Sequence, residues 1–358
     1  MKLVIFGLTM SSSWGNGHAT LWRGLCRSLV RRGHDVVFFE RDVPYYAAHR
    51  DLAQMPGVQL VLYAQWNDAL DSFRQELADA DAAMVTSYCP DGIAATEIVG
   101  ECPGLKLFYD LDTPVTLDSV KSGRVLNYIG PRGLRDFDLV LSFTGGQALD
   151  ELRAELGARV VLPLYGHVDP DAHRPAPRMP QYEADLSYLG TYAADRQQAL
   201  EELFVAPARR APERRFVIGG AQYPEAFPWA PNIFFVRHLP PAEHPSFFSS
   251  SLLTLNVTRR AMAEMGFCPS GRLFEAAACG VPILSDSWQG LETFFTPDEE
   301  ILITRSADDT LRALERSHHE LTRIATAARE RTLSEHTADR RALELEVALD
   351  SATSQVRV

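Results

Sequence analysis

Short apolar, β-branched runs alternate along this chain with longer segments in which apolar residues recur at helical spacing. This alternation is typical of strand–helix–strand units that build a parallel sheet. In the first half we expect helices at 18–32, 68–80, 91–100 and 147–156, with Gly33 and Gly157 as stops for two of them. Seven strands are expected around these helices, at 2–7, 35–40, 58–63, 82–86, 106–109, 139–143 and 159–162. The first half thus predicts one α/β domain.

Between Pro163 and Pro180 the alternation lapses, because the prolines there allow neither a helix nor a central strand. We interpret this stretch as an interdomain linker. Alternation then resumes, with helices expected at 195–204 and 271–279 and strands at 185–189, 215–218, 232–236, 252–256 and 282–285. From Asp308 onward the pattern is helical. A second parallel-sheet domain is therefore predicted.

Composition narrows the possible functions. The 358 residues exceed what one hydrophobic core usually serves, in agreement with two domains. The formal net charge of −12 argues against nucleic acid as a partner and against anionic membranes. The first apolar run, 3–8, is too short for a signal-peptide core, and we expect no integral membrane segment. Five widely spaced cysteines without a CxxC pair suit a cytoplasmic protein.

The segment SGRLFEAAACGVPILSD, 270–286, carries the clearest chemical signal. Ser270 is a good helix N-cap, and Gly271 leaves room for an anion at the backbone N–H groups of the first turn. A pyrophosphate would fit there. Arg272 adds a guanidinium, and Glu275 projects from the same helix face as Gly271, where it could accept hydrogen bonds from ribose hydroxyls. The alternative is an ordinary capped helix with a local surface ion pair between Arg272 and Glu275.

The small-residue run that follows makes this segment specific. It resembles the C-terminal signature of GT-B glycosyltransferases, in which a Glu-Ala-small-small-Cys-Gly-x-Pro segment lines the donor pocket. It resembles still more closely the group that includes the spore-maturation protein CgeB. Supporting motifs lie in both halves of the chain: LNVTR (255–259), GFCPSGRLFEAAACG (266–280), SDSWQGLETFF (285–295), FYDLDTPVTL (108–117) and LPLYGHVDP (162–170).

The resemblance implies a GT-B fold, with two Rossmann-like parallel-sheet domains facing a central cleft and a C-terminal helix that crosses back to the first domain. The expected domains are 1–168, with 336–358 packed back on it, and 169–335. It also implies transfer of a sugar from a nucleotide-diphosphate sugar, with a UDP- or dTDP-sugar expected, to a small-molecule or glycan acceptor. No cofactor and no metal are expected. The sugar, the acceptor, the stereochemical outcome and the oligomeric state stay open.

The resemblance also assigns donor-site residues. Backbone from Ser270 through Gly271 to Leu273, with Arg272, would hold the diphosphate, and Glu275 the ribose. Further donor-side candidates follow strand ends, where ligands bind to such sheets: Gly190, Thr191, Tyr192, Arg196, Arg237, His238, Asn256 and Arg259. There is one departure from the family pattern. Many retaining GT-B enzymes carry a second Glu eight residues before the first, and here that position is Phe267.

In the first domain, Trp14-Gly15-Asn16-Gly17-His18 lies between the first strand and the first helix. The glycines permit close backbone approach, and His18 could act as general base toward an acceptor hydroxyl, as in related inverting GT-B enzymes. The alternative is that His18 only caps or packs the loop.

Asp110 and Asp112 have the spacing of the metal-binding DxD of GT-A enzymes, because two carboxylates at that spacing can hold Mg²⁺ or Mn²⁺. The linker and second sheet favour GT-B instead. We therefore interpret both as acceptor-side residues at a strand end, with a structural turn at Asp112-Thr113-Pro114 as the default.

Two other function classes are weighed against glycosyl transfer. A nicotinamide-dependent oxidoreductase is suggested by Gly15, Gly17 and Glu40, but the third glycine of the fingerprint is Thr20. A non-catalytic nucleotide-sugar-binding or coat-associated protein is suggested by Phe267 at the position of the missing Glu, since a fold alone does not establish turnover.

Overall fold

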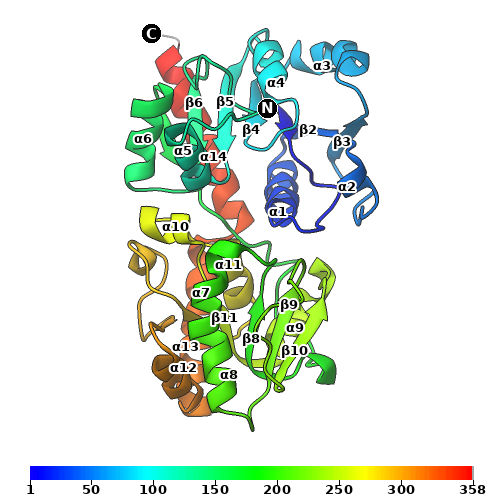
Figure 1. Cartoon of the computed structure of the whole chain (residues 1–358). Coiled ribbons are helices and arrows are strands. Elements are labelled where there is room, and N and C mark those ends of the chain that lie inside the picture. Colours follow the sequence, from blue (N-terminus) through cyan, green and yellow to red (C-terminus); the bar gives the residue numbers. More distant parts are fainter. Residues whose placement is uncertain (357–358) are drawn as a thin grey trace. The chain divides into compact units, whose positions relative to one another are not determined.

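The computed structural model describes residues 1–356 and divides into two compact units (Figure 1). The first unit comprises Met1–Tyr165 and the segment that begins at Ala338, and the second comprises Gly166–Thr337. The sequence predicts these two boundaries after 168 and after 335. Residues 357 and 358, which belong to the first domain in that prediction, lie outside the described residues. No helix within residues 1–356 has the length and apolarity of a membrane span.

The first unit is built on a seven-stranded sheet in the order β3-β2-β1-β4-β5-β6-β7, with every neighbouring pair parallel. Its strands are β1 (Lys2–Gly7), β2 (Asp35–Arg41), β3 (Val58–Tyr63), β4 (Ala82–Thr86), β5 (Leu105–Asp110), β6 (Leu139–Ser142) and β7 (Val161–Pro163). The central strands are apolar and buried along almost their whole length, because helices cover both faces of a parallel sheet. The strand order reverses at β1, where sheets of this kind bind ligands.

The helices of this unit are α1 (His18–Arg31), α2 (Pro44–Ala47), α3 (Leu70–Leu77), α4 (Gly92–Val99), α5 (Thr113–Lys121), α6 (Gln147–Leu156) and the C-terminal α14 (Ala338–Val356). α14 returns to the first unit, as the GT-B prediction requires. It buries Ala342 and Leu345, and the Arg341 guanidinium donates to the backbone oxygen of Tyr165 over 3.1 Å. Glu346 of α14 pairs with Arg32 beyond the end of α1, at 2.6 Å.

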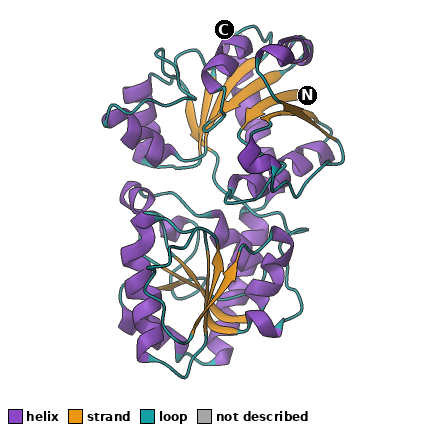
Figure 2. Ribbon diagram, turned by 45° about the vertical axis from the view of Figure 1, so that its right-hand side comes forward, coloured by secondary structure: helices purple, strands orange, loops and turns teal. Residues whose placement is uncertain are grey.

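The second unit contains a six-stranded parallel sheet in the order β10-β9-β8-β11-β12-β13. Its strands are β8 (Ala184–Leu189), β9 (Phe216–Gly220), β10 (Ile233–Arg237), β11 (Ser251–Asn256), β12 (Ile283–Ser285) and β13 (Leu302–Ile303). Its helices are α7 (Gln197–Leu200), α8 (Ala206–Arg210), α9 (His244–Ser249), α10 (Arg260–Met265), α11 (Gly271–Ala278), α12 (Ala307–Leu314) and α13 (His318–Glu335). Figure 2 shows these strands as an inner layer with helices around them.

Several local predictions need correction. The helix expected at 195–204 is interrupted, because α7 passes into a π-helical turn at Glu201–Val205 before α8. The seventh strand ends in Pro163, which a parallel sheet tolerates here because β7 is an edge strand. The expected turn at Asp112-Thr113-Pro114 instead starts α5, with Pro114 in the first turn, where its missing N–H costs no helical bond. The two-residue β13 was not predicted.

Candidate functional site

The predicted donor residues gather at one edge of the second sheet. β8 to β12 end at Leu189, Gly220, Arg237, Asn256 and Ser285, and parallel strands bring these ends to one side, which we call the second carboxyl edge. α11 starts from this edge, since it leads from the end of β11 back to the start of β12. The structure therefore places here Gly190, Thr191, Tyr192, Arg196, Arg237, His238, Asn256, Arg259, Ser270, Gly271, Arg272, Leu273 and Glu275.

The N-terminus of α11 is capped as predicted. The Ser270 hydroxyl accepts a hydrogen bond from the Arg272 backbone N–H at 3.3 Å, and the Ser270 backbone oxygen accepts one from Leu273 N–H at 3.1 Å. Two of the N–H groups expected to meet a diphosphate are thus engaged within the cap. An anion at this helix end would share or replace those bonds, and the Arg272 guanidinium lies in the same first turn.

Glu275 lies in a buried charged cluster. The residue is only 3% exposed, and its Oε2 accepts from the Arg272 guanidinium. His173 Nε2 and His244 Nδ1 each lie 3.9 Å from the same oxygen. Burial opposes ionisation of Glu275, but Arg272 and the two histidines outweigh it and lower the pKa of the carboxyl to about 2. The alternative of a surface ion pair therefore does not describe this residue.

No sequence motif points to His173 and His244. They come from a loop and from the first residue of α9, 71 residues apart, so no motif spacing joins them. The sequence signal for them is only the presence of histidine in segments that are predicted to be linker and loop.

The turn after β8 depends on close backbone approach. A Cβ on Gly190 would come 2.7 Å from Tyr188 Oη, and a Cβ on Gly220 would come 2.0 Å from the backbone oxygen of Gly190. Arg196 donates to Tyr188 Oη at 3.2 Å and to the Thr191 backbone oxygen at 3.4 Å. Its buried Nε has no hydrogen-bond partner, which is unusual for a guanidinium and suits a ligand-binding role.

Polar residues fill the rest of the second carboxyl edge. Asn256 donates to Ser285 Oγ at 3.1 Å, and Arg259 pairs with Asp195 at 3.0 Å. Asp286, which is not among the predicted site residues, accepts from the backbone N–H and the hydroxyl of Thr258, both at 3.0 Å. Burial raises the pKa of Asp286.

Backbone strain occurs in loops of both units. Tyr88, Gln222 and His238 follow β4, β9 and β10, and Phe267 follows α10. All four are non-glycine residues with positive φ, which is costly for a side-chain-bearing residue and is often found at functional sites. Phe267 has φ of 47° and packs against Gly290, where a Cβ would lie 2.4 Å from the phenyl ring. An aromatic ring thus occupies the position at which the family resemblance leads to the expectation of a second Glu.

In the first unit, β1, β4, β5 and β6 end at the first carboxyl edge, where His18 and Asp112 face one another. His18 Nε2 lies 3.8 Å from Asp112 Oδ2, and the His18 ring centroid is 5.7 Å from that of Tyr88. Burial lowers the pKa of His18, although Asp112 acts in the opposite direction. The imidazole is therefore neutral near pH 7, as a general base requires, and its buried Nδ1 has no hydrogen-bond partner.

Two contacts position the loop before His18. Asn16 Oδ1 accepts from the His18 backbone N–H at 3.0 Å, and the Trp14 ring stacks on His49 with centroids 4.0 Å apart. Gly15 has φ of 59°, which favours glycine. Nothing lies within 4 Å of a Cβ built on Gly17, so that residue leaves open space beside the loop.

Asp110 is fully buried and acts on α5 rather than at a surface. Its Oδ1 accepts from Asp112 N–H at 3.2 Å and from Thr116 Oγ1 at 3.0 Å, while Oδ2 has no hydrogen-bond partner. Burial raises the pKa of Asp110 to about 7. Within residues 1–356 the one group of three possible metal ligands is His173, His244 and Glu275, and it includes neither Asp110 nor Asp112.

Asp110 should make stability depend on pH. Because its pKa is about 7 in the folded chain against an ordinary value of 3.8, the unfolded chain releases this proton first as pH rises. Wild type is therefore expected to lose stability between about pH 4 and about pH 7, and Asp110→Asn should remove that decline. Urea unfolding at several pH values tests this. Asp118→Asn, at an exposed residue of α5, is the control; equal pH profiles for wild type and Asp110→Asn would contradict the prediction.

Glu40, the acidic residue that would bind the cofactor ribose in the oxidoreductase alternative, makes other hydrogen bonds in the structure. Glu40 is completely buried and accepts from Thr9 Oγ1 at 2.7 Å, from Met10 N–H at 2.8 Å, and from the Ser11 N–H and hydroxyl at 3.0 and 2.5 Å. Its carboxylate fixes the loop after β1 and is not available to a cofactor ribose.

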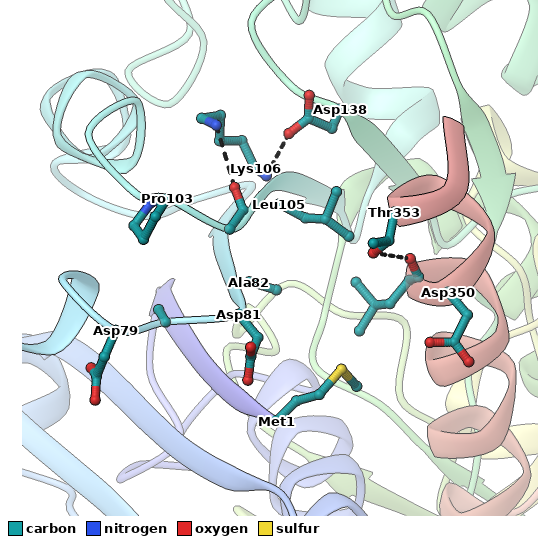
Figure 3. A pocket seen from close by; sticks show the side chains of 13 residues that line it. Met1, Asp79, Asp81, Ala82, Pro103, Leu105, Lys106, Asp138, Asp350 and Thr353 are labelled. Atoms are coloured by element: carbon teal, nitrogen blue, oxygen red, sulfur yellow. Dashed lines mark hydrogen bonds between the residues drawn. The ribbon is translucent and has the colours of Figure 1, made fainter. Parts of the chain in front are cut away.

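A cavity of about 580 Å³ lies at the opposite edge of the first sheet (Figure 3). Its lining includes Ala82 and Leu105, which begin β4 and β5, together with Met1, Asp81 and Asp350. This is the amino edge of the strands. The cavity is therefore separate from the side where His18 and Asp112 lie.

Comparisons with known proteins agree with this architecture. Residues 196–346 match the family model described as glycosyl transferase-like. No curated protein gives a significant sequence match. Sucrose-phosphate synthase from Thermosynechococcus elongatus superimposes with a TM-score of 0.72 at 15% identity, over 99% of this chain and 100% of that chain. Anabaena HepE in complex with UDP and glucose superimposes with a TM-score of 0.68 at 13% identity, over 98% of this chain and 100% of that chain. An α-glucosyltransferase in complex with UDP-glucose and DNA superimposes with a TM-score of 0.68 at 13% identity, over 99% of each chain.

These findings define the class of the protein by its fold, which is GT-B. The predicted pair of parallel-sheet units with a returning C-terminal helix is confirmed. The matched segment of the second unit contains Glu275 and the other donor-side candidates from Arg196 onward.

Proposed function

We propose that this chain is a glycosyltransferase that takes a sugar from a nucleotide-diphosphate donor. The observation that carries the proposal is the second carboxyl edge, which combines the Ser270-capped start of α11 with four arginines in a chain whose net charge is −12. Arg272 lies in the first turn of α11, Arg237 ends β10, and Arg196 and Arg259 lie in the segments after β8 and β11. Cationic side chains and a helix N-terminus together suit a diphosphate. The glycosyl transferase-like match over 196–346 supports the same assignment.

Within this proposal, the backbone at Ser270–Leu273 and Arg272 hold the diphosphate. Arg196 adds its guanidinium beside the turn Gly190-Thr191-Tyr192. Arg272 must turn from Glu275 toward the phosphate, which is feasible because its side chain is 29% exposed. Glu275 then accepts from the ribose, and the strand end at Arg237 and His238 contacts the base. Asn256 and Arg259 complete the donor side.

The first unit supplies the general base of the transfer reaction. A neutral His18 takes the proton of the acceptor hydroxyl as that oxygen bonds to the anomeric carbon and the nucleoside diphosphate leaves. Asp112 stabilises the imidazolium that results. Trp14, Gly15, Asn16 and Gly17 border the acceptor, while Asp110 supports Asp112 from beneath. Diphosphate charge is balanced by arginines and backbone N–H groups, without a metal in the transfer step. A UDP- or dTDP-sugar as donor and a small molecule or glycan as acceptor suit this arrangement. We also propose that the chain belongs to the CgeB-like group.

Thermal-shift titration with UDP, dTDP, GDP and their sugars tests the donor site. A ligand at about 100 times its Kd stabilises the folded chain by about 2.7 kcal/mol, which raises the Tm of a unit of this size by several degrees. Arg272→Ala should abolish the shift. Arg210→Ala, which removes an exposed arginine on α8, should retain it. If no nucleoside diphosphate at millimolar concentration changes the Tm, the donor assignment is wrong.

A non-catalytic nucleotide-sugar-binding protein remains the second candidate, because Phe267 replaces a carboxylate of the retaining family members. The two candidates differ in turnover. Release of free nucleoside diphosphate on incubation with donor and cell extract would favour the enzyme, and tight binding without release would favour the binding protein.

A further inference from the structure

Three potential metal ligands converge inside the second unit from segments that are far apart in sequence. His173 lies in the segment before β8, His244 begins α9, and Glu275 lies on α11. Their side chains are each only 3–4% exposed. Two imidazoles and a carboxylate are the ligand types of zinc-class cations, and burial removes the competition from bulk water.

The spacing of the three ligand atoms suits one cation. His173 Nε2 and His244 Nδ1 are 3.4 Å apart, and each is 3.9 Å from Glu275 Oε2. The centre of a triangle with these sides lies about 2.2 Å from every corner, close to the usual zinc–nitrogen and zinc–oxygen bond lengths. Little movement of the side chains is therefore needed to coordinate a cation.

The surroundings orient these ligands for binding. The other ring nitrogen of His244, Nε2, is 3.3 Å from the Leu239 backbone oxygen, and a proton on Nε2 leaves the Nδ1 lone pair toward the centre of the cluster.

Arg272 is the competing cation. Its guanidinium pairs with the same Glu275 oxygen, and a divalent ion would displace it. The partial exposure of the Arg272 side chain allows it to leave the cluster while the histidines stay in place.

We propose that His173, His244 and Glu275 form a binding site for one zinc-class divalent cation. The cation would tie the segment before β8, α9 and α11 together, and the burial of its ligands keeps it out of the transfer step. This goes beyond the proposed glycosyl transfer, and it places one Glu275 oxygen on the metal and the other toward the ribose.

Metal content and Co²⁺ binding of the full chain test the site. We expect about one equivalent of Zn²⁺ after reconstitution, and a Co²⁺ complex with the strong visible absorption of four-coordinate nitrogen and oxygen ligation. His173→Gln is expected to weaken Co²⁺ binding by more than about tenfold. His318→Gln, at an exposed histidine of α13, should bind like wild type.

Arg272→Ala provides an independent arm, because it removes the competing cation and leaves all three ligands intact. It should bind Co²⁺ more tightly than wild type, and this comparison decides the question even if His173→Gln fails to fold. Absence of stoichiometric Zn²⁺ and Co²⁺ binding in wild type would overturn the proposal. So would equal Co²⁺ affinity of folded His173→Gln and His318→Gln. Neither readout uses a nucleotide, so failure here is distinguishable from failure of the proposed function.

Discussion

Replacement of His18 by asparagine is expected to lower turnover about 10²- to 10⁴-fold, the usual contribution of a general base. Asparagine keeps a polar side chain of similar size at the start of α1 but cannot accept the proton of the acceptor hydroxyl. Because His18 belongs to the first unit and the proposed donor residues to the second, affinity for the nucleoside diphosphate should be unchanged. Release of nucleoside diphosphate in the presence of acceptor-containing extract measures turnover, and calorimetry with UDP and dTDP measures binding.

His34→Asn is the matched control for this experiment. His34 lies in the same unit just before β2, at the opposite end of the strands, and contacts Glu346 of α14 at 2.7 Å. Its replacement should leave turnover intact once folding is verified. Turnover of His18→Asn within about threefold of wild type would show that the base lies elsewhere, since a general base contributes far more than that.

Glu275→Ala is expected to weaken nucleoside-diphosphate binding at least about tenfold and to destabilise the second unit by about 3 kcal/mol, because removing one partner of a buried ion pair leaves the other charge uncompensated. Breaking a buried ion pair usually costs about 3–5 kcal/mol, and we expect the lower value because the Arg272 side chain is partly exposed to solvent. Calorimetry measures the first effect and urea unfolding the second. Glu264→Ala, at a largely exposed glutamate of α10, is the control and should change neither quantity.

The stability difference between wild type and Glu275→Ala should depend on pH. The folded pKa of Glu275 is about 2, below the ordinary value of 4.5, so its contribution is present above about pH 4.5 and disappears as pH falls toward 2. Glu275→Gln should reproduce most of the loss at pH 7, because it removes the charge and keeps the shape. Wild-type affinity for UDP and dTDP in Glu275→Ala would contradict a ribose contact.

Strand and helix positions in this protein follow closely from the sequence, since parallel strands are apolar on both faces. β1, β3 and β4 coincide with their predicted bounds. Errors occur where local signals are ambiguous. The Asp112-Thr113-Pro114 segment has turn chemistry, yet Pro114 stands in the first turn of α5, because proline suits both settings. β13 is too short to leave a hydrophobic pattern.

Some features of the candidate site could be predicted from the sequence and others could not. The cap at Ser270 could be predicted, because a helix N-cap depends on residues adjacent in the chain. The pairing of Glu275 with His173 and His244 could not, since three separate segments meet only when the second unit has folded. Similarly, the sequence marked Asp110 and Asp112 as equivalent carboxylates, and burial separates their roles by leaving Asp110 beneath α5 and Asp112 beside His18.

The SGRLFEAAACGVPILSD segment and the alternation of apolar strands with helices were sufficient, by themselves, to determine two parallel-sheet units and a capped helix with an arginine and a glutamate on it. Tertiary structure alone decided that Glu275 is a buried anion held by Arg272 and two histidines rather than a surface charge. It also decided that the Glu40 carboxylate is fully hydrogen-bonded to the loop after β1. The physical reason is that local patterns report backbone conformation and amphipathicity, whereas burial and charge pairing depend on which distant segments come together.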